Sequence, residues 1–146
     1  MTQSTRTIKG ISKGKRKALQ LVELLKAEGI EAVTEYRFAA ELVGGTGKGL
    51  RERLKDAGLH DWRFDIAITL HLIAIELDGA VFTLGRHSRG LGVISDMDKI
   101  NAATINGWRV IRFTHTHHNH FDIVDMVKRI ISPNVIQPTF HTDCKG

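Results

Sequence analysis

WRFDIAITLHLIAIELDG, residues 62–79, contains two runs in which apolar and polar residues alternate. Such alternation is typical of a β-strand with one buried face. In the first run, Trp62, Phe64, Ile66 and Ile68 are expected to share one face, with Arg63, Asp65 and Ala67 on the other. Leu70 and His71 separate the two runs. The sequence therefore predicts two antiparallel strands, over 62–69 and 72–79, joined by a turn.

Helices are predicted on both sides of this pair of strands. Apolar residues at helical spacing predict a helix over 12–28, with Ser12 as its N-cap and Gly29 as its stop. Residues 30–38 fit either a short strand or the end of a helix. A glycine-rich loop then leads to a short basic helix over 50–57.

The second half of the chain continues the same architecture. We expect a helix over 95–106, a third strand over 107–114 and a last amphipathic helix over 121–131, for which Asn119 is the candidate cap. This order predicts a single α/β domain with a mixed central sheet flanked by helices. The domain is expected to span residues 12–131, with a flexible basic arm at 1–11 and a tail at 132–146.

Composition narrows the class of protein. The length of 146 residues suits one domain, and 42% hydrophobic with 25% charged residues argues against a disordered chain. The single cysteine, Cys144, excludes an intrachain disulfide and indicates a cytoplasmic protein. No apolar run approaches the ~18 residues of a membrane span. The net charge of +5 favours a polyanionic partner, with nucleic acid as the first candidate.

Three carboxylates stand out in the predicted hairpin. Asp65, Glu76 and Asp78 are expected to point to one face of otherwise apolar strands. Close carboxylates repel one another unless a proton or a cation lies between them, and Mg²⁺ prefers such oxygen ligands. The alternative is that all three face solvent on an open side of the sheet.

These residues resemble the Asp…Glu-x-Lys signature of the restriction-endonuclease-like nuclease superfamily, PD-(D/E)xK. The chain is most similar to small phage and bacterial nucleases of the very-short-patch repair endonuclease type. The resemblance covers roughly residues 20–115, from EYRF (35–38) through IELDG (75–79) and GRHSRG (85–90) to DMDKINAATINGWRVIRFT (96–114). It implies a restriction-endonuclease-like fold and Mg²⁺-dependent cleavage of DNA, with Mn²⁺ expected to substitute.

The resemblance also implies roles for individual residues. Asp65 and Glu76 would ligate the metal together with the backbone carbonyl of Leu77. Glu35 resembles the glutamate that many members use to complete the site or to hold a second metal. The signature lysine is absent, because Asp78 occupies its position. Asp78 either joins the metal site or points away and caps the loop at Gly79.

Two residues are candidates to replace the missing lysine. Lys99 lies on the helix after the loop, where some members of this superfamily carry their lysine. His87 resembles the histidine that acts as a general acid or base in the repair endonucleases. The alternatives are that Lys99 pairs with Asp96 on a solvated helix face and that His87 is an ordinary loop residue.

Basic loops supply the predicted DNA contacts. Arg86 and Arg89, between glycines, suit phosphate oxygens, unless this is a plain solvated loop. Lys48 and Arg51 lie in the Gly- and Lys-rich segment 44–55, which is interpreted as a flexible flap over the DNA. The histidine run HTHHNH (115–120) is interpreted as an exposed loop, because no supporting zinc ligands are evident.

The resulting hypothesis is a Mg²⁺-dependent DNA endonuclease that cuts junctions, mismatches or flaps, or that nicks. It would act in the cytoplasm of a bacterial or phage-infected cell, as a monomer or as a homodimer. One alternative is a catalytically silent DNA-binding module with the same fold. The other is a metal-binding or RNA-processing protein centred on the histidine run.

Overall fold

A four-stranded mixed sheet forms the centre of the protein. The computed structural model describes residues 10–78, 89–114 and 118–132, with only the backbone of 89–91. The strands lie in the order β1-β2-β3-β4. The first three are antiparallel neighbours, and β3 pairs with β4 in parallel. The bounds are β1 Val33–Tyr36, β2 Phe64–Ile68, β3 Ile73–Asp78 and β4 Arg109–Thr114. The predicted α/β class with a mixed sheet is therefore confirmed.

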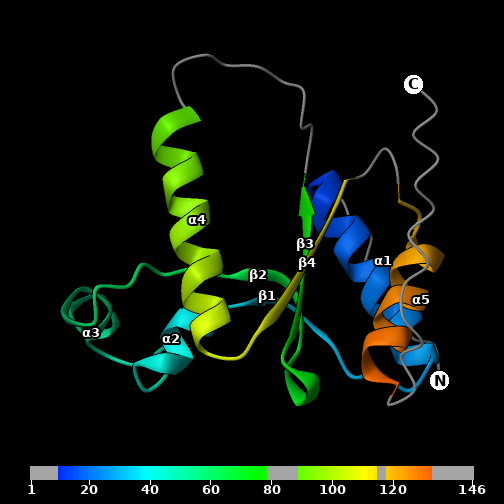
Figure 1. The fold of residues 1–146 in the computed structure, drawn as a ribbon, viewed down its shortest axis with the longest axis horizontal. Coiled ribbons are helices and arrows are strands. Elements are labelled where there is room, and N and C mark those ends of the chain that lie inside the picture. The colour runs from blue at the N-terminus through cyan, green and yellow to red at the C-terminus, as the bar shows by residue number, and fades with distance from the viewer. Residues whose placement is uncertain (1–9, 79–88, 115–117, 133–146) are drawn as a thin grey trace, which may run out of the picture.

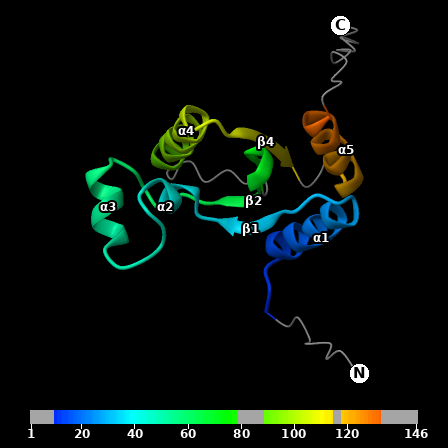
Figure 2. The same cartoon turned by 90° about the horizontal axis from the view of Figure 1, so that it is seen from below.

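Helices cover both faces of the sheet, as predicted. Figure 1 shows α1 and α5 on one side of the sheet and α4 on the other, and Figure 2 shows the same arrangement from below. The small helices α2 and α3 extend beyond the sheet on the α4 side. The bounds are α1 Lys13–Ala27, α2 Phe38–Leu42, α3 Leu50–Asp56, α4 Arg89–Ile105 and α5 His120–Ile131. No helix in these described segments is long and apolar enough to cross a membrane.

The predicted ends of α1 and α5 agree with the structure, whereas α4 begins at Arg89, six residues before the predicted start at 95. The Ser12 side chain accepts a hydrogen bond from the Lys15 backbone at the start of α1, and Gly29 follows its end with φ +77°. Asn119 and Asp122 form a capping box at the start of α5. Helix α2 was not predicted, because five residues are too few to show a helical period. The turn after β2 is a 3₁₀ turn, η1 (Thr69–His71).

The core has two layers of different composition. Aliphatic side chains fill the space between the sheet and the helices α1 and α5, including Leu21, Leu25, Ile66, Ile75 and Val127. The layer toward α4 and α2 is largely aromatic, with Phe38, Phe64 and Trp108 beside three alanines. Phe38 and Phe64 stack with ring centroids 4.2 Å apart. The aromatic layer places a flat, rigid surface beneath α4.

The simple alternation predicted for β2 is wrong at its first residue. Phe64 joins the aromatic layer with Ala67, whereas Ile66 and Ile68 join the aliphatic layer. The ladder between β1 and β2 pairs Thr34 with Ile66 and resumes at Tyr36 with Phe64, but it leaves out Glu35 and Asp65. Glu35 has φ +54°, a left-handed conformation that is uncommon for a residue other than glycine. This local break turns Phe64 to the opposite face.

Candidate active site

A buried ion pair joins β3 to α4. Lys99 Nζ lies 2.8 Å from Glu76 Oε1, and the two side chains are only 13% and 14% exposed. Glu76 follows Ile75 on β3 and therefore points to the α4 face, where Lys99 faces inward. Lys99 Nζ also lies 5.6 Å from the centre of the Phe64 ring. The alternative in which Lys99 pairs with Asp96 is wrong, because Asp96 lies instead 3.5 Å from Arg112.

The Glu76 carboxyl is set apart from the other carboxyls by its surroundings. Burial raises its pKa above the ordinary value, and the nearby charge of Asp65 raises it further. The ion pair with Lys99 and a hydrogen bond with the Asp65 backbone lower the pKa, but burial is the larger effect. A largely buried carboxylate with a raised pKa and a single lysine partner is a strong candidate for a catalytic or ligand-binding residue.

This pKa shift can be measured directly. We expect the Glu76 carboxyl to titrate above 4.5 in the protein without metal, as followed by ¹³C NMR of the side-chain carboxyl groups. The folded state then holds this proton more tightly than the unfolded state, so the free energy of unfolding should fall as pH rises from 4.5 through the folded-state pKa. Since a metal binds only the ionised carboxylate, Mg²⁺ affinity should rise over the same interval. A Glu76 signal that titrates below 4.5 would contradict this description.

Asp65 lies one strand away from Glu76 and faces the other way. Its Oδ2 accepts a hydrogen bond of 2.7 Å from the backbone N–H of Leu77. The Asp65 carboxylate lines a small cavity of about 50 Å³ with Glu35 and Leu77, closed by Gly14, Lys15 and Ala18 of α1. This volume is enough for one water molecule or a small cation. Three of the predicted site residues, Glu35, Asp65 and Leu77, are thus brought together.

The prediction that Asp65, Glu76 and Asp78 point to the same face of the sheet is wrong. Asp65 lies with Glu35 on the α1 side, whereas Glu76 lies on the α4 side. The cause is the break in the β1–β2 ladder, which turns the chain at Asp65. Within the described segments, no three His, Cys, Asp or Glu side chains are arranged to hold a metal ion. Mg²⁺ commonly uses only one or two carboxylates and keeps its remaining ligands as water, so the donors present still suit this ion.

Asp78 has a partner of its own. Arg112 of β4 donates two hydrogen bonds to its carboxylate, at 3.0 and 2.9 Å. Parallel pairing places Arg112 directly opposite Glu76. Arg112 is a site residue that sequence reasoning missed, because the register between β3 and β4 cannot be read from either strand alone. Lys15 was also missed, because it comes beside Asp65 only through the packing of α1 against the sheet.

The predicted DNA contacts are only partly described. Lys48 and Arg51 are exposed, on the loop before α3 and on α3 itself. The loop is not a free flap: the Arg53 guanidinium donates to the carbonyls of Val43, Gly45 and Lys48 and holds it against α3. Arg86 and His87 lie outside the described residues, and Arg89 is described only by its backbone at the start of α4.

The histidine run is likewise described in part. His115 and His117 lie outside the described residues. The ring of His118 packs edge-on against Phe113, with centroids 5.1 Å apart, and His120 is the first residue of α5.

No protein-family model matches this chain, and no curated protein or solved structure matches it either. The fold and the geometry around Glu76 are therefore the observations from which a function can be inferred.

Proposed function

We propose that this protein is a Mg²⁺-dependent DNA endonuclease with a restriction-endonuclease-like, PD-(D/E)xK fold. The observation that carries the proposal is the buried pair of Glu76 and Lys99, 2.8 Å apart. The signature lysine is missing two residues after Glu76, and a lysine from α4 reaches the same carboxylate instead. Its ammonium group stands beside the carboxylate that the resemblance assigns to the metal.

The architecture also supports the proposal of a nuclease. A mixed sheet lies between helices on both faces, and Asp65 and Glu76 occupy neighbouring strands. The two carboxyl groups are close enough for the charge of Asp65 to raise the pKa of Glu76. A divalent cation beside them would remove this repulsion, which is a physical reason for two acidic residues in a largely apolar region.

Each residue has a chemical task in this proposal. Asp65 would hold Mg²⁺ with Glu35 and the Leu77 carbonyl as further donors on the α1 side of the sheet, and the Glu76 carboxylate, which faces α4 here, would have to turn toward the ion to join them. When bound, the ion would supply a water of lowered pKa and would neutralise charge on the scissile phosphate. The Lys99 ammonium orients the attacking water and stabilises the developing negative charge. Arg112 holds Asp78, so that this carboxylate does not compete for Lys99.

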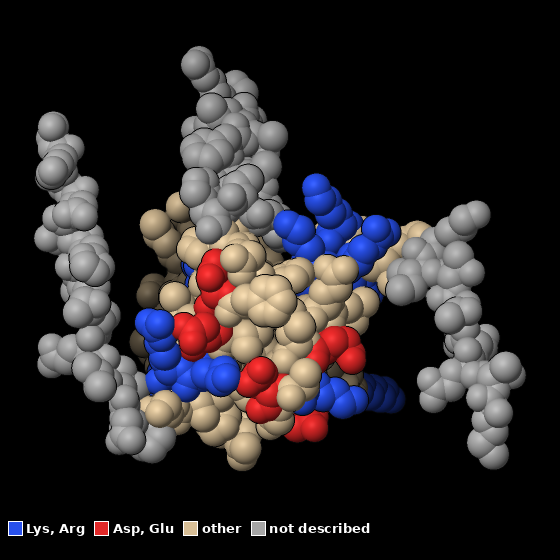
Figure 3. All heavy atoms as spheres, turned by 90° about the vertical axis from the view of Figure 1, so that its right-hand side faces the viewer, with Lys and Arg blue, Asp and Glu red and all other residues tan. Residues whose placement is uncertain are grey.

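The surface offers places for a DNA backbone. Figure 3 shows Lys and Arg side chains gathered at one end of the face that α1 and α5 cover, while charges of both signs mix over the rest. The first turn of α1 carries the exposed residues Lys13, Lys15 and Arg16. None of the three has an ion-pair partner in the described part of the chain. Lys15 also lines the cavity of Asp65, so these cations lie next to the candidate site.

A cleavage assay tests the proposal. Supercoiled plasmid and end-labelled duplex, nicked, flap, four-way-junction and single-stranded DNA are incubated with the protein in Mg²⁺, in Mn²⁺ and in EDTA. We expect products in both metals and none in EDTA, with branched or mismatched DNA cut fastest. Asp65→Asn, which keeps an oxygen for the Leu77 N–H, should be inactive on every substrate. DNA binding without cleavage in any metal would identify a silent DNA-binding module instead.

A further inference from the structure

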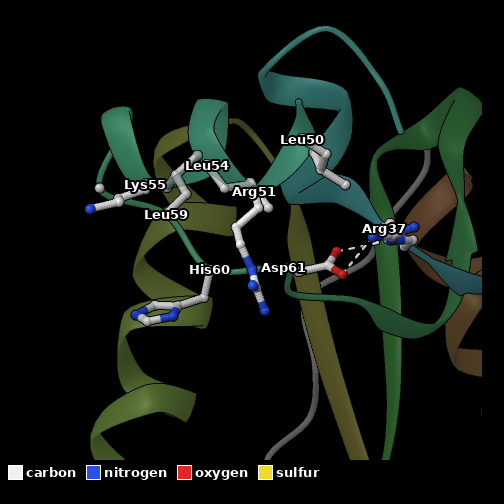
Figure 4. Close-up of a pocket in the computed structure, with 9 residues that line it drawn as sticks. Arg37, Leu50, Arg51, Leu54, Lys55, Leu59, His60 and Asp61 are labelled. Carbon is white, nitrogen blue, oxygen red and sulfur yellow. Dashed lines mark hydrogen bonds and ion pairs between the residues drawn. The ribbon is translucent and has the colours of Figure 1, made fainter. Parts of the chain in front are cut away.

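A second concave site lies on the far side of the aromatic layer from Glu76. It is a pocket of about 760 Å³ between α3 and the segment that leads into β2 (Figure 4). This volume is within the range of sites that bind small organic ligands. Its lining consists of cations, leucines and one imidazole ring: Arg37, Arg51, Lys55, Leu50, Leu54, Leu59 and His60, with Asp61 and Gly58.

The pocket carries excess positive charge. Its one carboxylate, Asp61, is neutralised by Arg37, whose guanidinium donates two hydrogen bonds of 2.9 and 2.6 Å. Arg63 adds a second cation at 3.7 Å from the same carboxylate. In contrast, Arg51 and Lys55 have no ion-pair partner in the described segments. Figure 4 shows the Arg51 side chain extending from α3 toward His60 and Asp61.

The other lining side chains are leucines and one imidazole ring. Leu54 and Leu59 lie together on one side, Leu50 lies nearer to Arg37, and the imidazole of His60 lies on a further side (Figure 4). The His60 ring contacts the Trp62 ring at a centroid distance of 5.4 Å. Free cations beside leucines and an aromatic ring suit a ligand that is anionic at one end and planar and apolar at the other. A nucleotide, with its phosphate and its base, has this chemistry.

Stacked rings connect the pocket to the candidate active site. Trp62 stacks on Phe38 and Phe38 on Phe64, with centroids 6.4 and 4.2 Å apart. Lys99 lies over Phe64 and binds Glu76. Trp62 also reaches α4, where its Nε1 lies 3.5 Å from Ser95 Oγ. The pocket and the Glu76–Lys99 pair are therefore held at a fixed separation by one packed cluster.

We propose that this pocket binds one unpaired nucleotide of the DNA substrate. Its base lies between the leucines and the His60 ring, and its phosphate contacts Arg51, while Lys55, whose side chain extends away from Arg51 (Figure 4), is left for the next phosphate along the strand. The inference rests on the proposed nuclease function, because that function supplies DNA as the ligand, and it names the substrate class as DNA with an unpaired residue. A base inside a duplex is stacked and paired, so it does not enter the pocket without unstacking.

Binding in EDTA tests this site without cleavage. The affinities of the full-length protein for a 5′-flap DNA, and for a fully paired duplex of equal length, are measured by fluorescence anisotropy. We expect the double variant Arg51→Ala/Lys55→Ala to bind the flap roughly tenfold more weakly, and the duplex at most about threefold more weakly. The matched control Lys26→Ala/Lys128→Ala removes the same charge from the exposed surface of α1 and α5, and it should leave the ratio of the two affinities unchanged.

A base analogue reports on stacking directly. 2-Aminopurine at the unpaired position should lose fluorescence on binding the wild-type protein, and His60→Ala should restore most of that signal. Equal weakening of flap and duplex binding by Arg51→Ala/Lys55→Ala would reduce the site to ordinary backbone contacts and overturn the proposal. No weakening of either would overturn it as well. Tight binding of free dAMP, with no discrimination between flap and duplex, would also overturn it and assign the pocket to a free nucleotide.

The two proposals can fail separately. If the pocket variants lose flap preference but the wild-type protein never cuts DNA, the pocket stands and the nuclease function falls. If the wild-type protein cuts in Mg²⁺ and the pocket variants keep its preference for unpaired DNA, the nuclease function stands and the pocket falls.

Discussion

Replacing Glu76 with glutamine should lower the rate of Mg²⁺-dependent DNA cleavage by at least about 10²-fold, the scale of losing one group that stabilises charge in a transition state. The amide keeps the size of the carboxyl group and an oxygen for Lys99 Nζ, but it removes the negative charge that a metal requires. DNA affinity in EDTA should not change, because Glu76 is largely buried and its ion pair is with Lys99, not with the exposed cations proposed to contact DNA. Single-turnover cleavage and fluorescence anisotropy measure the two quantities.

Asp98→Asn is a matched control for this substitution. Asp98 is an exposed carboxylate on α4, one residue before Lys99, so its change also removes one negative charge near the site. We expect its cleavage rate to stay within about twofold of wild type, because exposed charges interact weakly through water. Cleavage by Glu76→Gln at the wild-type rate would mean that the candidate active site is wrong.

Replacing Lys99 with methionine should affect both rate and stability. Methionine retains an apolar chain over the Phe64 ring but no charge, so we again expect a loss of roughly 10²-fold in rate. The substitution leaves the largely buried Glu76 carboxylate without its cationic partner. This loss should lower the free energy of unfolding by about 1–3 kcal/mol. Burial already raises the pKa of Glu76, and loss of Lys99 raises it further. The destabilisation should therefore be larger at pH 8 than at pH 5.

A second substitution separates the two effects of Lys99. The double variant Lys99→Met/Glu76→Gln has no uncompensated charge, so we expect it to recover most of the lost stability while its cleavage rate stays low. Urea unfolding at both pH values and single-turnover kinetics provide the comparison. If Lys99→Met cuts at the wild-type rate, the water-orienting role moves to His87.

The sequence was most informative where structure is local. Alternating residues in 62–79 predicted β2 and β3, and helical spacing with Ser12 and Gly29 predicted α1 to within a residue or two at each end. These patterns are set by the pleat of a strand, the turn of a helix and the residues that cap it, all of which act over a few positions.

The site was less predictable, because its geometry depends on packing between distant segments. The pair of Glu76 and Lys99 joins residues 23 positions apart, and the choice of Glu76 over Asp96 depends on how α4 lies on the sheet. The faces of Phe64 and Asp65 were misassigned because the chain turns at Glu35 on the neighbouring strand. Strand alternation assumes an unbroken ladder, and no residue near 65 signals the break.

The packing of α5 against α1 has a consequence for synthesis of the chain. Lys128 Nζ binds Glu28 across 100 residues of sequence, at 2.7 Å, and Val127 shares the aliphatic layer with Leu21 and Leu25. While the chain emerges from the ribosome, α1 can cover only its own part of that side of the sheet, and the part that α5 covers stays open until residues 120–131 have left the exit tunnel. Contacts so distant in sequence form late and slow folding. The aliphatic face of the nascent chain is thus the surface on which a chaperone would bind.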